Sequence, residues 1–476
     1  MKEMGSSNRN VFASGAKQSH ELFHLHFILP TTRCQLLLQT ITVFCLLLLP
    51  TTRCFSQEDP KGEVYQYARK IVDTLASPSM HGRGYVNGGD SIAAVYLKKE
   101  FAKLGVKPIG KEYYQRFAFP VNTFPNKMLV EINGKKLIPG KDFIVNPNSY
   151  KRKYKTKRIA YLTLMYSLDS MQKFENEYEK CQLIKSALFI DKGNSDTILK
   201  YNYKFDENIK SILSHDCSPT IPVIVRDEKL TWDVSLDYSE TSFFIEILKS
   251  SLPAEIKKVK IDIKNKFFPQ HKTQNIIGYI PGTQFPDSFI VYTAHYDHLG
   301  QMGKDTYFPG ANDNASGCAM LLNLAKYYSA HPPKYSIAVM AFAGEEAGLL
   351  GSSYYAQHPL FPLKQIKFLI NFDIVGTGDE GIKVVNATEF PLQFKTLQVL
   401  NSQNSYLKEV QPRGTTMNSD HYPFYSNGVK CFFIYTLGGI KAYHDIYDKA
   451  ETLPLTKFED LYKLMIDFTD WLQSPK

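Results

Sequence analysis

Two adjacent carboxylates interrupt an apolar part of the chain. Glu345 and Glu346 lie in the segment AFAGEEAGLLGS (341–352), and the preceding run YSIAVMAFA predicts a buried strand. Like charges at the end of such a strand repel each other, and the loss of water around them raises the cost. A compensating positive charge would be needed to keep both side chains ionised.

Further side chains that can bind a metal or move a proton follow other predicted strands or precede a helix. They are His295, Asp297 and His298 in AHYDHLG, Asp313 in GANDNASG, Asp373 in NFDIVG and His444 in KAYHDIYDKAETL. Each also has a structural explanation: Asp313 could cap a helix, Asp373 could begin a turn, and the glutamates could complement a helix dipole. Their coincidence in one part of the chain favours a site. Histidine and carboxylate without thiolate suit catalytic zinc, and one bridging carboxylate would allow two ions, so the pattern predicts a metallohydrolase.

Alternating helices and strands must position these residues. After residue 266 the chain shows a strand–turn–strand segment and then, in order, a helix, a strand, a helix and a strand: NIIGYIPGTQFPDSFIVYTAHYDHLG, GCAMLLNLAKYYSA, SIAVMAFA, GLLGSSYYAQ and IKFLINFDIVG. This order predicts a three-layer α/β/α domain with a central mixed sheet. Polar side chains at strand ends would then gather where α/β folds place their sites.

The preceding part of the chain divides into two regions. Residues 57–117 predict two helices around the glycine-rich break SMHGRGYVNGGD, the second with Ile92, Val95 and Phe101 on its apolar face and a stop at Gly105. Residues 118–265 contain the short β-like runs MLVEING, RIAYLTL, SALFID and TIPVIVRD, and a charged helix near 170–186. We therefore predict a catalytic domain formed by 57–117 and 266–476, with a smaller β-rich domain inserted at 118–265.

The first 56 residues predict an export leader. The apolar core QLLLQTITVFCLLLLP (35–50) follows several basic residues, is short for a membrane-spanning helix and suits a signal peptide. Ser56 offers a small residue for cleavage before Gln57. We expect an exported protein, periplasmic or secreted, with no stable membrane span after signal removal. Lipid anchoring at Cys54 is less favoured, because Arg53 stands where such sites require a small residue.

Composition and cysteine content limit the other possibilities. With 43% hydrophobic residues the chain can bury a sizeable core, and its formal charge is +9. The densest basic run, YKRKYKTKR (150–158), predicts a solvated face, so we expect no nucleic-acid partner. Of the seven cysteines, four follow the leader; Cys181 and Cys217 could pair, whereas Cys318 and Cys431 lie in apolar segments and predict buried thiols.

Five motifs in order carry a specific resemblance. AHYDHLG, GANDNASG, AGEEAGLLGS, NFDIVG and the final YHD resemble the di-zinc aminopeptidases of metallopeptidase family twenty-eight, over roughly residues 266–450. The similarity extends to 60–115 through GRG and AAVYLKKEFAKLGVKP, and the middle block resembles the protease-associated insertion of many members. The resemblance implies an exported, bacterial-type enzyme that binds two Zn²⁺ ions and hydrolyses peptide bonds of a peptide or small-protein substrate.

The resemblance also implies a role for each residue. His295 and Asp373 would complete one zinc shell, Glu346 and His444 the other, and Asp313 would bridge both. Glu345 would be the general base that takes the proton of zinc-activated water, leaving hydroxide to attack, and Tyr443 would steady the oxyanion. Asp297, two residues along the strand from His295 and so on the same face, would orient that imidazole. His298, Asp420 and His421 would support the site from nearby.

Other functions stay open at this point. Glutaminyl cyclases share the fold and most ligands but use one zinc, and they carry Trp where this chain has Tyr443. A non-enzymatic scaffold would have lost ligands or the base, and none is missing here. The sequence does not separate aminopeptidase from carboxypeptidase or dipeptidase. Arg413, in VQPRGTTMNSD, is a candidate for carboxylate recognition. Side-chain preference, oligomeric state and the role of the insertion are also left open.

Overall fold

The computed structural model describes residues 62–474, apart from 164–175, 177–184, 192–212 and 214–218. The predicted leader, the charged helix near 170–186 and the possible pairing of Cys181 with Cys217 lie outside the described residues. Within the described part of the chain, no helix is both long enough and apolar enough to cross a membrane.

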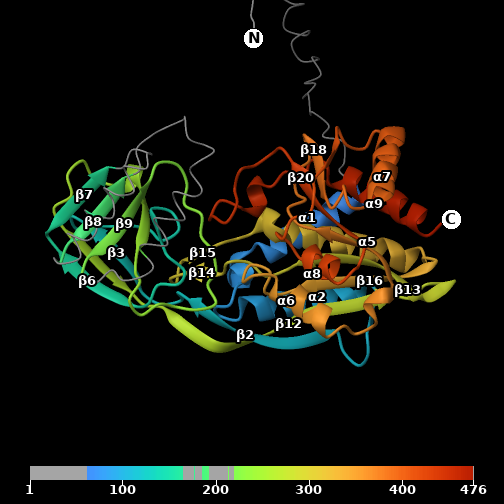
Figure 1. Cartoon of the computed structure of the whole chain (residues 1–476), viewed down its shortest axis with the longest axis horizontal. Helices are drawn as coiled ribbons and strands as arrows, with labels where there is room; N and C mark the ends of the chain where they lie inside the picture. The colour runs from blue at the N-terminus through green and yellow to red at the C-terminus, as the bar shows by residue number, and fades with distance from the viewer. Residues whose placement is uncertain (1–61, 164–175, 177–184, 192–212, 214–218, 475–476) are drawn as a thin grey trace, which may run out of the picture. The chain divides into compact units, whose positions relative to one another are not determined.

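A mixed sheet of nine strands organises the larger part of the structure (Figure 1). In spatial order its strands are β1 (Lys107–Pro108), β12 (Lys266–Ile280), β16 (Tyr335–Phe342), β13 (Phe285–His295), β17 (Ile366–Phe372), β20 (Cys431–Leu437), β18 (Gly381–Val385) and β19 (Val410–Pro412), with β2 (Tyr114–Thr123) also paired to β12. The four strands β16, β13, β17 and β20 are mutually parallel. β12 runs antiparallel to β16, and β18 runs antiparallel to β20 but parallel to β19. The predicted central mixed sheet is confirmed.

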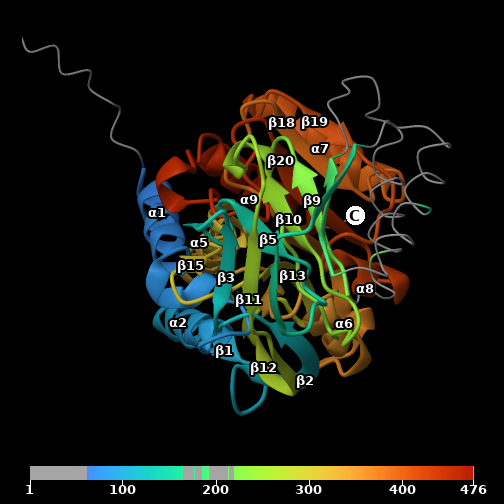
Figure 2. The ribbon, with the colours of Figure 1, turned by 90° about the vertical axis from the view of Figure 1, so that its left-hand side faces the viewer.

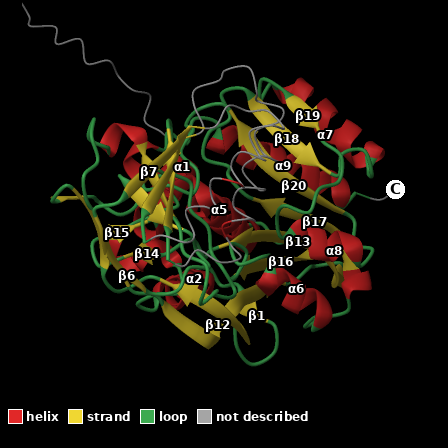
Figure 3. Cartoon of the chain, turned by 60° about the vertical axis from the view of Figure 1, so that its left-hand side comes forward, coloured by secondary structure: helices red, strands yellow, loops and turns green. Residues whose placement is uncertain are grey.

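Side chains alternate between the two faces of this sheet and bury a separate core on each. On β13, Ile290 and Tyr292 enter one core, and Phe289 and Val291 enter the other. The first face is covered by α1 (Glu63–Leu75), α2 (Gly89–Lys103), α5 (Gly317–Ala330), α7 (Pro391–Asn404) and α9 (Phe458–Leu472). The second is covered by α6 (Leu350–Gln357) and α8 (His421–Ser426). The three-layer α/β/α prediction is therefore confirmed (Figure 3).

The predicted apolar face of α2 is wrong in part. Ile92 and Val95 are 39% and 45% exposed, whereas Ala93, Ala94 and Phe101 are buried. Small alanine side chains bring the helix close to the sheet, so the long β-branched residues are left on the outer side. Helical periodicity alone favoured the larger residues.

The described residues between 128 and 263 contribute the strands of two further sheets (Figure 2). One has the order β5 (Phe143–Val145), β10 (Ile245–Leu248), β9 (Ile221–Arg226), β8 (Ala187–Asp191), β7 (Ile159–Thr163), and the other β4 (Lys135–Lys136), β3 (Met128–Ile132), β11 (Val259–Ile263), β6 (Arg152–Thr156). Val130, Phe189 and Ile261 are fully buried in the core that these sheets share. All four β-like runs form strands. The domain boundaries stay a prediction; β2 crosses the one placed between 117 and 118.

The chain also forms a small two-stranded ribbon and buries two thiols. β14 (Gln301–Met302) and β15 (Thr306–Tyr307) form a separate ribbon between β13 and α5. Cys318 and Cys431 are buried free thiols, as predicted, and burial raises the pKa of both to about 12. These thiols are therefore protonated at neutral pH and pack as small apolar groups.

Candidate metal centre

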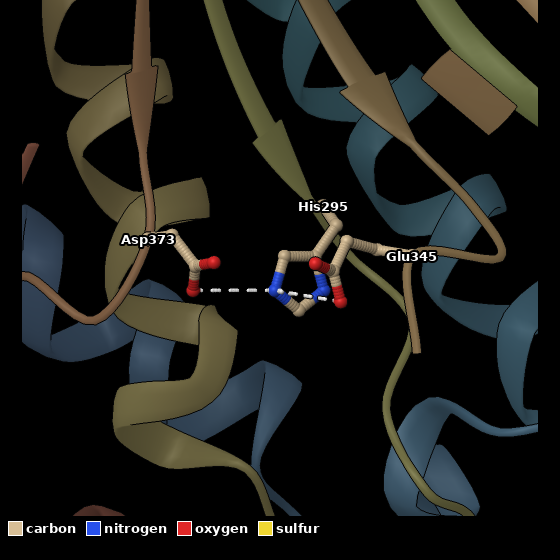
Figure 4. Close-up of side chains that lie close together, drawn as sticks. All are labelled: His295, Glu345 and Asp373. Carbon is tan, nitrogen blue, oxygen red and sulfur yellow. Dashed lines mark hydrogen bonds and ion pairs between the residues drawn. The ribbon is translucent and has the colours of Figure 1, made fainter. Parts of the chain in front are cut away.

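The predicted site residues come from loops at the carboxyl edge of the parallel strands. His295 is the last residue of β13, Glu345 and Glu346 follow β16, and Asp373 directly follows β17. Because parallel strands end at one edge of a sheet, these side chains converge. Figure 4 shows His295 between Glu345 and Asp373.

Five side chains predicted as ligands meet in this place. His295 Nε2 lies 3.3 Å from Asp313 Oδ1 and 3.3 Å from Asp373 Oδ1. His444 Nε2 lies 3.0 Å from Glu346 Oε2 and 3.3 Å from Asp313 Oδ2. Asp313 thus directs one carboxylate oxygen to each imidazole, which is the arrangement a bridging carboxylate requires. The residues are brought together as expected, while their role as ligands stays a prediction.

The two adjacent glutamates occupy different positions. After β16 the chain turns at Gly344, whose φ of 74° is one that glycine adopts easily. The Glu346 side chain is 3% exposed and contacts His444, whereas that of Glu345 is 13% exposed and lines a pocket beside the cluster. Glu345 Oε2 lies 3.9 Å from His295 Nε2. One carboxylate is therefore enclosed among imidazoles, and the other faces the space that a substrate can enter.

The protonation of His444 is set by its neighbours. Its Nδ1 lies 3.0 Å from the Trp232 carbonyl oxygen and 2.9 Å from Asp233 Oδ1. Both partners only accept hydrogen bonds, so the proton stays on Nδ1, and in the neutral ring Nε2 offers a lone pair to a metal. Sequence analysis missed Trp232 and Asp233, which belong to the region predicted as an insertion. An exposed acid in a loop gives no signal of such a role.

Asp297 lies beside His295, as expected, but for a different reason than the one given by the sequence. β13 ends at His295, so the argument from alternating strand faces is wrong. Its carboxylate lies 3.7 Å from His295 Nδ1, and its backbone oxygen is closer, at 3.3 Å. The carboxylate also accepts hydrogen bonds from the Tyr85 hydroxyl and from the backbone N–H groups of Glu345, at 3.3 Å, and Glu346, at 3.4 Å. It therefore orients His295 and holds the glutamate turn together.

Tyr85 is a third residue that sequence analysis missed. It lies in the glycine-rich break and is 3% exposed. Burial and the charge of Asp297 raise the pKa of the Tyr85 phenol well above its usual value, so the hydroxyl stays protonated and donates to Asp297. A tyrosine among glycines carries no pattern that distinguishes this use from loop packing.

Two buried charged residues fix the Asp313 loop. Asp448 accepts hydrogen bonds from the backbone N–H groups of Asn312, at 2.8 Å, and Asp313, at 2.9 Å. Arg83 is completely buried, and its guanidinium group donates five hydrogen bonds, all to backbone carbonyls. The acceptors belong to Leu75, Tyr296, Pro309, Gly310 and Asp313. Because a guanidinium has five N–H donors, its whole capacity is used, and it ties this loop to the end of α1 and to the residue after β13.

The remaining candidates lie near the cluster without joining the five, and their expected roles stay predictions. His298 is fully buried, and its Nδ1 lies 2.5 Å from Glu346 Oε1. Asp420 is also buried, which raises its pKa to about 7, and its charge contributes to the raised pKa of Glu345. The His421 ring lies 5.3 Å from Phe433, and burial lowers the pKa of that imidazole to about 4. Tyr443 stacks on His444 with 4.0 Å between ring centroids and is 44% exposed.

Charge and donor chemistry fit metal ions at this point. Burial and the charges of Asp373 and Glu346 raise the pKa of Glu345 well above its usual value. Burial alone would lower the pKa of His295, but the charges of Glu345 and Asp373 raise it instead. The buried carboxylates thus favour positive charge at their centre. A set of imidazole and carboxylate donors without thiolate is typical of catalytic zinc, and Asp313 could serve two ions.

Comparison with known proteins agrees with this assignment. Residues 275–469, which include all five predicted ligands, match the sequence model of Peptidase family M28. This part of the chain belongs to that family. Aminopeptidase YwaD of Bacillus subtilis (strain 168) is 32% identical over 199 residues, which are 39% of this chain and 40% of the relative. A probable zinc metalloprotease of Pyrenophora teres f. teres (strain 0-1) is 40% identical over 113 residues, 23% of each chain. The chain thus matches less than half the length of these relatives.

Solved structures resemble the chain over a greater length. BSAP, a zinc aminopeptidase from Bacillus subtilis, aligns with a TM-score of 0.62 at 19% identity, over 85% of this chain and 94% of that one. The Peptidase M28 precursor from Shewanella amazonensis SB2B aligns with a TM-score of 0.64 at 15% identity, over 87% and 96%. At these identities the likeness establishes the fold alone.

Proposed function

We propose that this protein is a zinc-dependent aminopeptidase that hydrolyses the first peptide bond of peptides. The observation that carries the proposal is the Asp313 carboxylate, which faces His295 and His444 with one oxygen each at 3.3 Å. Membership of residues 275–469 in Peptidase family M28 and the names of the relatives support it.

The residues would divide between two metal positions. His295 and Asp373 would hold one Zn²⁺ ion, Glu346 and His444 the other, with Asp313 shared. Two such ions would supply Lewis acidity, which lowers the pKa of a water molecule and polarises the scissile carbonyl. The Nδ1 contacts of both imidazoles keep each Nε2 directed into the cluster.

Glu345 would move the proton. Glu345 lines the pocket. Its Oε2 lies 3.9 Å from His295 Nε2, whereas Glu346 Oε2 lies only 3.0 Å from His444 Nε2. As the water oxygen bonds to the carbonyl carbon, Glu345 takes the water proton and returns it to the leaving nitrogen as the C–N bond breaks. Tyr443, which also lines the pocket, would donate a hydrogen bond to the oxyanion. Asp297 would keep the glutamate turn in position through its backbone contacts.

Metal content and turnover test this proposal together. The full-length mature protein would be assayed with leucine amides that carry a free or an acetylated N-terminus. We expect about two zinc ions per chain and cleavage of the free amine only. Glu345→Gln should retain zinc and lose about 10²–10⁴-fold in kcat, which is the usual contribution of general base catalysis. Glu346→Gln should lose zinc as well. One zinc per chain with ammonia release from N-terminal glutamine would instead indicate cyclisation.

Export belongs to the same proposal. We propose that residues 1–56 act as a signal peptide and that the mature protein is periplasmic or secreted. Support comes from the short apolar core at 35–50 and the small residue Ser56. N-terminal sequencing of the protein from cell fractions should find Gln57 first. An intact leader on active protein in the cytoplasm would contradict export and leave the chemistry untouched.

A further inference from the structure

A pocket beside the metal cluster carries one cation among its lining residues. Its volume is about 250 Å³, and five of its lining residues belong to the cluster or border it: Asp313, Glu345, Asp373, Tyr443 and His444. The others are Ile374, Arg413, Asn418, Phe433 and Tyr435. The volume is below the roughly 300–1,000 Å³ of pockets for drug-sized ligands, so it suits one amino-acid residue.

The backbone holds Arg413 in a fixed place at the edge of the large sheet. Arg413 follows β19; its N–H donates to the Val384 carbonyl at 2.9 Å, and its own carbonyl accepts from Ala387 N–H at 3.2 Å. The guanidinium Nη1 donates to the Tyr435 hydroxyl at 3.0 Å, and its central carbon lies 5.8 Å from that ring centroid. The group is thus held in one orientation by a single aromatic residue.

Within the described part of the chain, Arg413 forms no ion pair with a carboxylate. A guanidinium has five N–H donors, and one is used by Tyr435. The Tyr435 hydroxyl accepts that bond and keeps its own proton to donate. The pocket therefore offers donors in a planar fork, which is the geometry that binds a carboxylate through two oxygens.

A second aromatic side chain, next to Tyr435, and the overall charge agree with a small acidic group. Phe433 is 3% exposed and presents an apolar surface for a methylene stem. Two divalent ions would balance the four carboxylates of Asp313, Glu345, Glu346 and Asp373. Arg413 would then supply the uncompensated charge of the pocket.

We propose that Arg413, aided by Tyr435, selects substrates that place a carboxylate in this pocket. The inference rests on the peptidase function proposed above and names its substrate class. The carboxylate has two possible sources: the side chain of an N-terminal glutamate or aspartate, or the free C-terminus of a very short peptide. Either would lie against Phe433 with its oxygens at the guanidinium group.

The test compares matched neutral and acidic substrates in the zinc-loaded full chain. The first arm uses Glu- and Gln-aminomethylcoumarin, which have no C-terminal carboxylate. The second uses Ala-Ala and its C-terminal amide. We expect the wild type to favour the acidic member of one pair at least tenfold in kcat/KM. Loss of a charged hydrogen bond lowers binding by about ten- to a hundredfold, so Arg413→Gln should abolish that ratio.

Two further variants separate charge from geometry. Arg413→Lys keeps the charge but loses the fork, and should retain only part of the ratio. Lys408→Gln removes an equal charge from an exposed position before β19 and should change neither ratio. A wild type that cleaves Leu-aminomethylcoumarin but favours neither acidic substrate would overturn the inference alone, as would an unchanged ratio in Arg413→Gln. A zinc-loaded wild type that cleaves none of these substrates would overturn the peptidase function, and this inference with it.

Discussion

A segment far from His444 in the sequence contacts its imidazole, and the contribution of these contacts to zinc binding can be measured directly. Asp233 and Trp232 lie between β9 and β10, more than two hundred residues before His444, and both contact its Nδ1. Trp232 N–H also donates to the His444 carbonyl at 3.0 Å, and Lys229 Nζ lies 3.0 Å from Asp445 Oδ2. The segment therefore fixes the position of the loop that carries the predicted ligand His444. The substitution Asp233→Ala removes the one charged side chain of this segment that contacts the His444 imidazole.

The structure sets the expected size of this effect. Losing a hydrogen-bond partner of a ligating histidine commonly weakens metal binding about 10- to 100-fold. Two features place Asp233 at the lower limit: its side chain is 60% exposed, so water screens its charge, and the Trp232 carbonyl can keep the same proton. We therefore expect about tenfold weaker binding of one zinc ion, or ~1.4 kcal/mol.

Competition with a chelating dye of known affinity would give both zinc constants. Asp233→Asn keeps an acceptor without the charge and should fall between wild type and Asp233→Ala. Glu240→Ala is the matched control, because Glu240 is exposed in the same segment and away from the site. Zinc binding by Asp233→Ala within twofold of the control would refute this reasoning. A thousandfold loss of zinc affinity with an unchanged thermal midpoint would show that the Trp232 carbonyl does not hold the Nδ1 proton in place of Asp233.

Three further predictions concern the supports of the site. Arg83→Lys should destabilise the fold by at least about 3 kcal/mol, because several buried carbonyls lose their donor; denaturant unfolding measures it, and a loss below 1 kcal/mol would contradict the account. Tyr85→Phe removes one hydrogen bond to Asp297 and should lower kcat more than it raises KM, with the zinc content unchanged. Removal of zinc with a chelator should lower the thermal midpoint, since ions at 1,000 times their Kd stabilise the folded state by about 4 kcal/mol each; an unchanged midpoint would show that these carboxylates hold no ion.

The sequence by itself determined the class of fold and the identity of the clustered residues. Alternating helices and strands are local patterns, so the sequence alone places α5, β16 and β17. His295, Glu346 and Asp373 could be found because ligand-type side chains at strand ends are chemically unusual. The parallel strands then bring them to one edge, a consequence of topology that sequence order already implies.

Other features depended on contacts between distant segments. β12 and β13 are joined by a short turn, as a hairpin would be, yet β16 lies between them in the sheet. The face that α2 buries was decided by close packing of alanines. No local pattern reports either choice, because strand order and packing distance depend on the whole core.

The same limit applies to the groups around the cluster. Asp233 contacts His444, and Tyr85 contacts Asp297, only because the fold brings these distant segments together. An exposed loop aspartate and a tyrosine among glycines are common, and their chemistry is set by neighbours far away in sequence. The ligands could be predicted because metal chemistry restricts which residues can serve; their supports could not, because any nearby hydrogen-bonding group can.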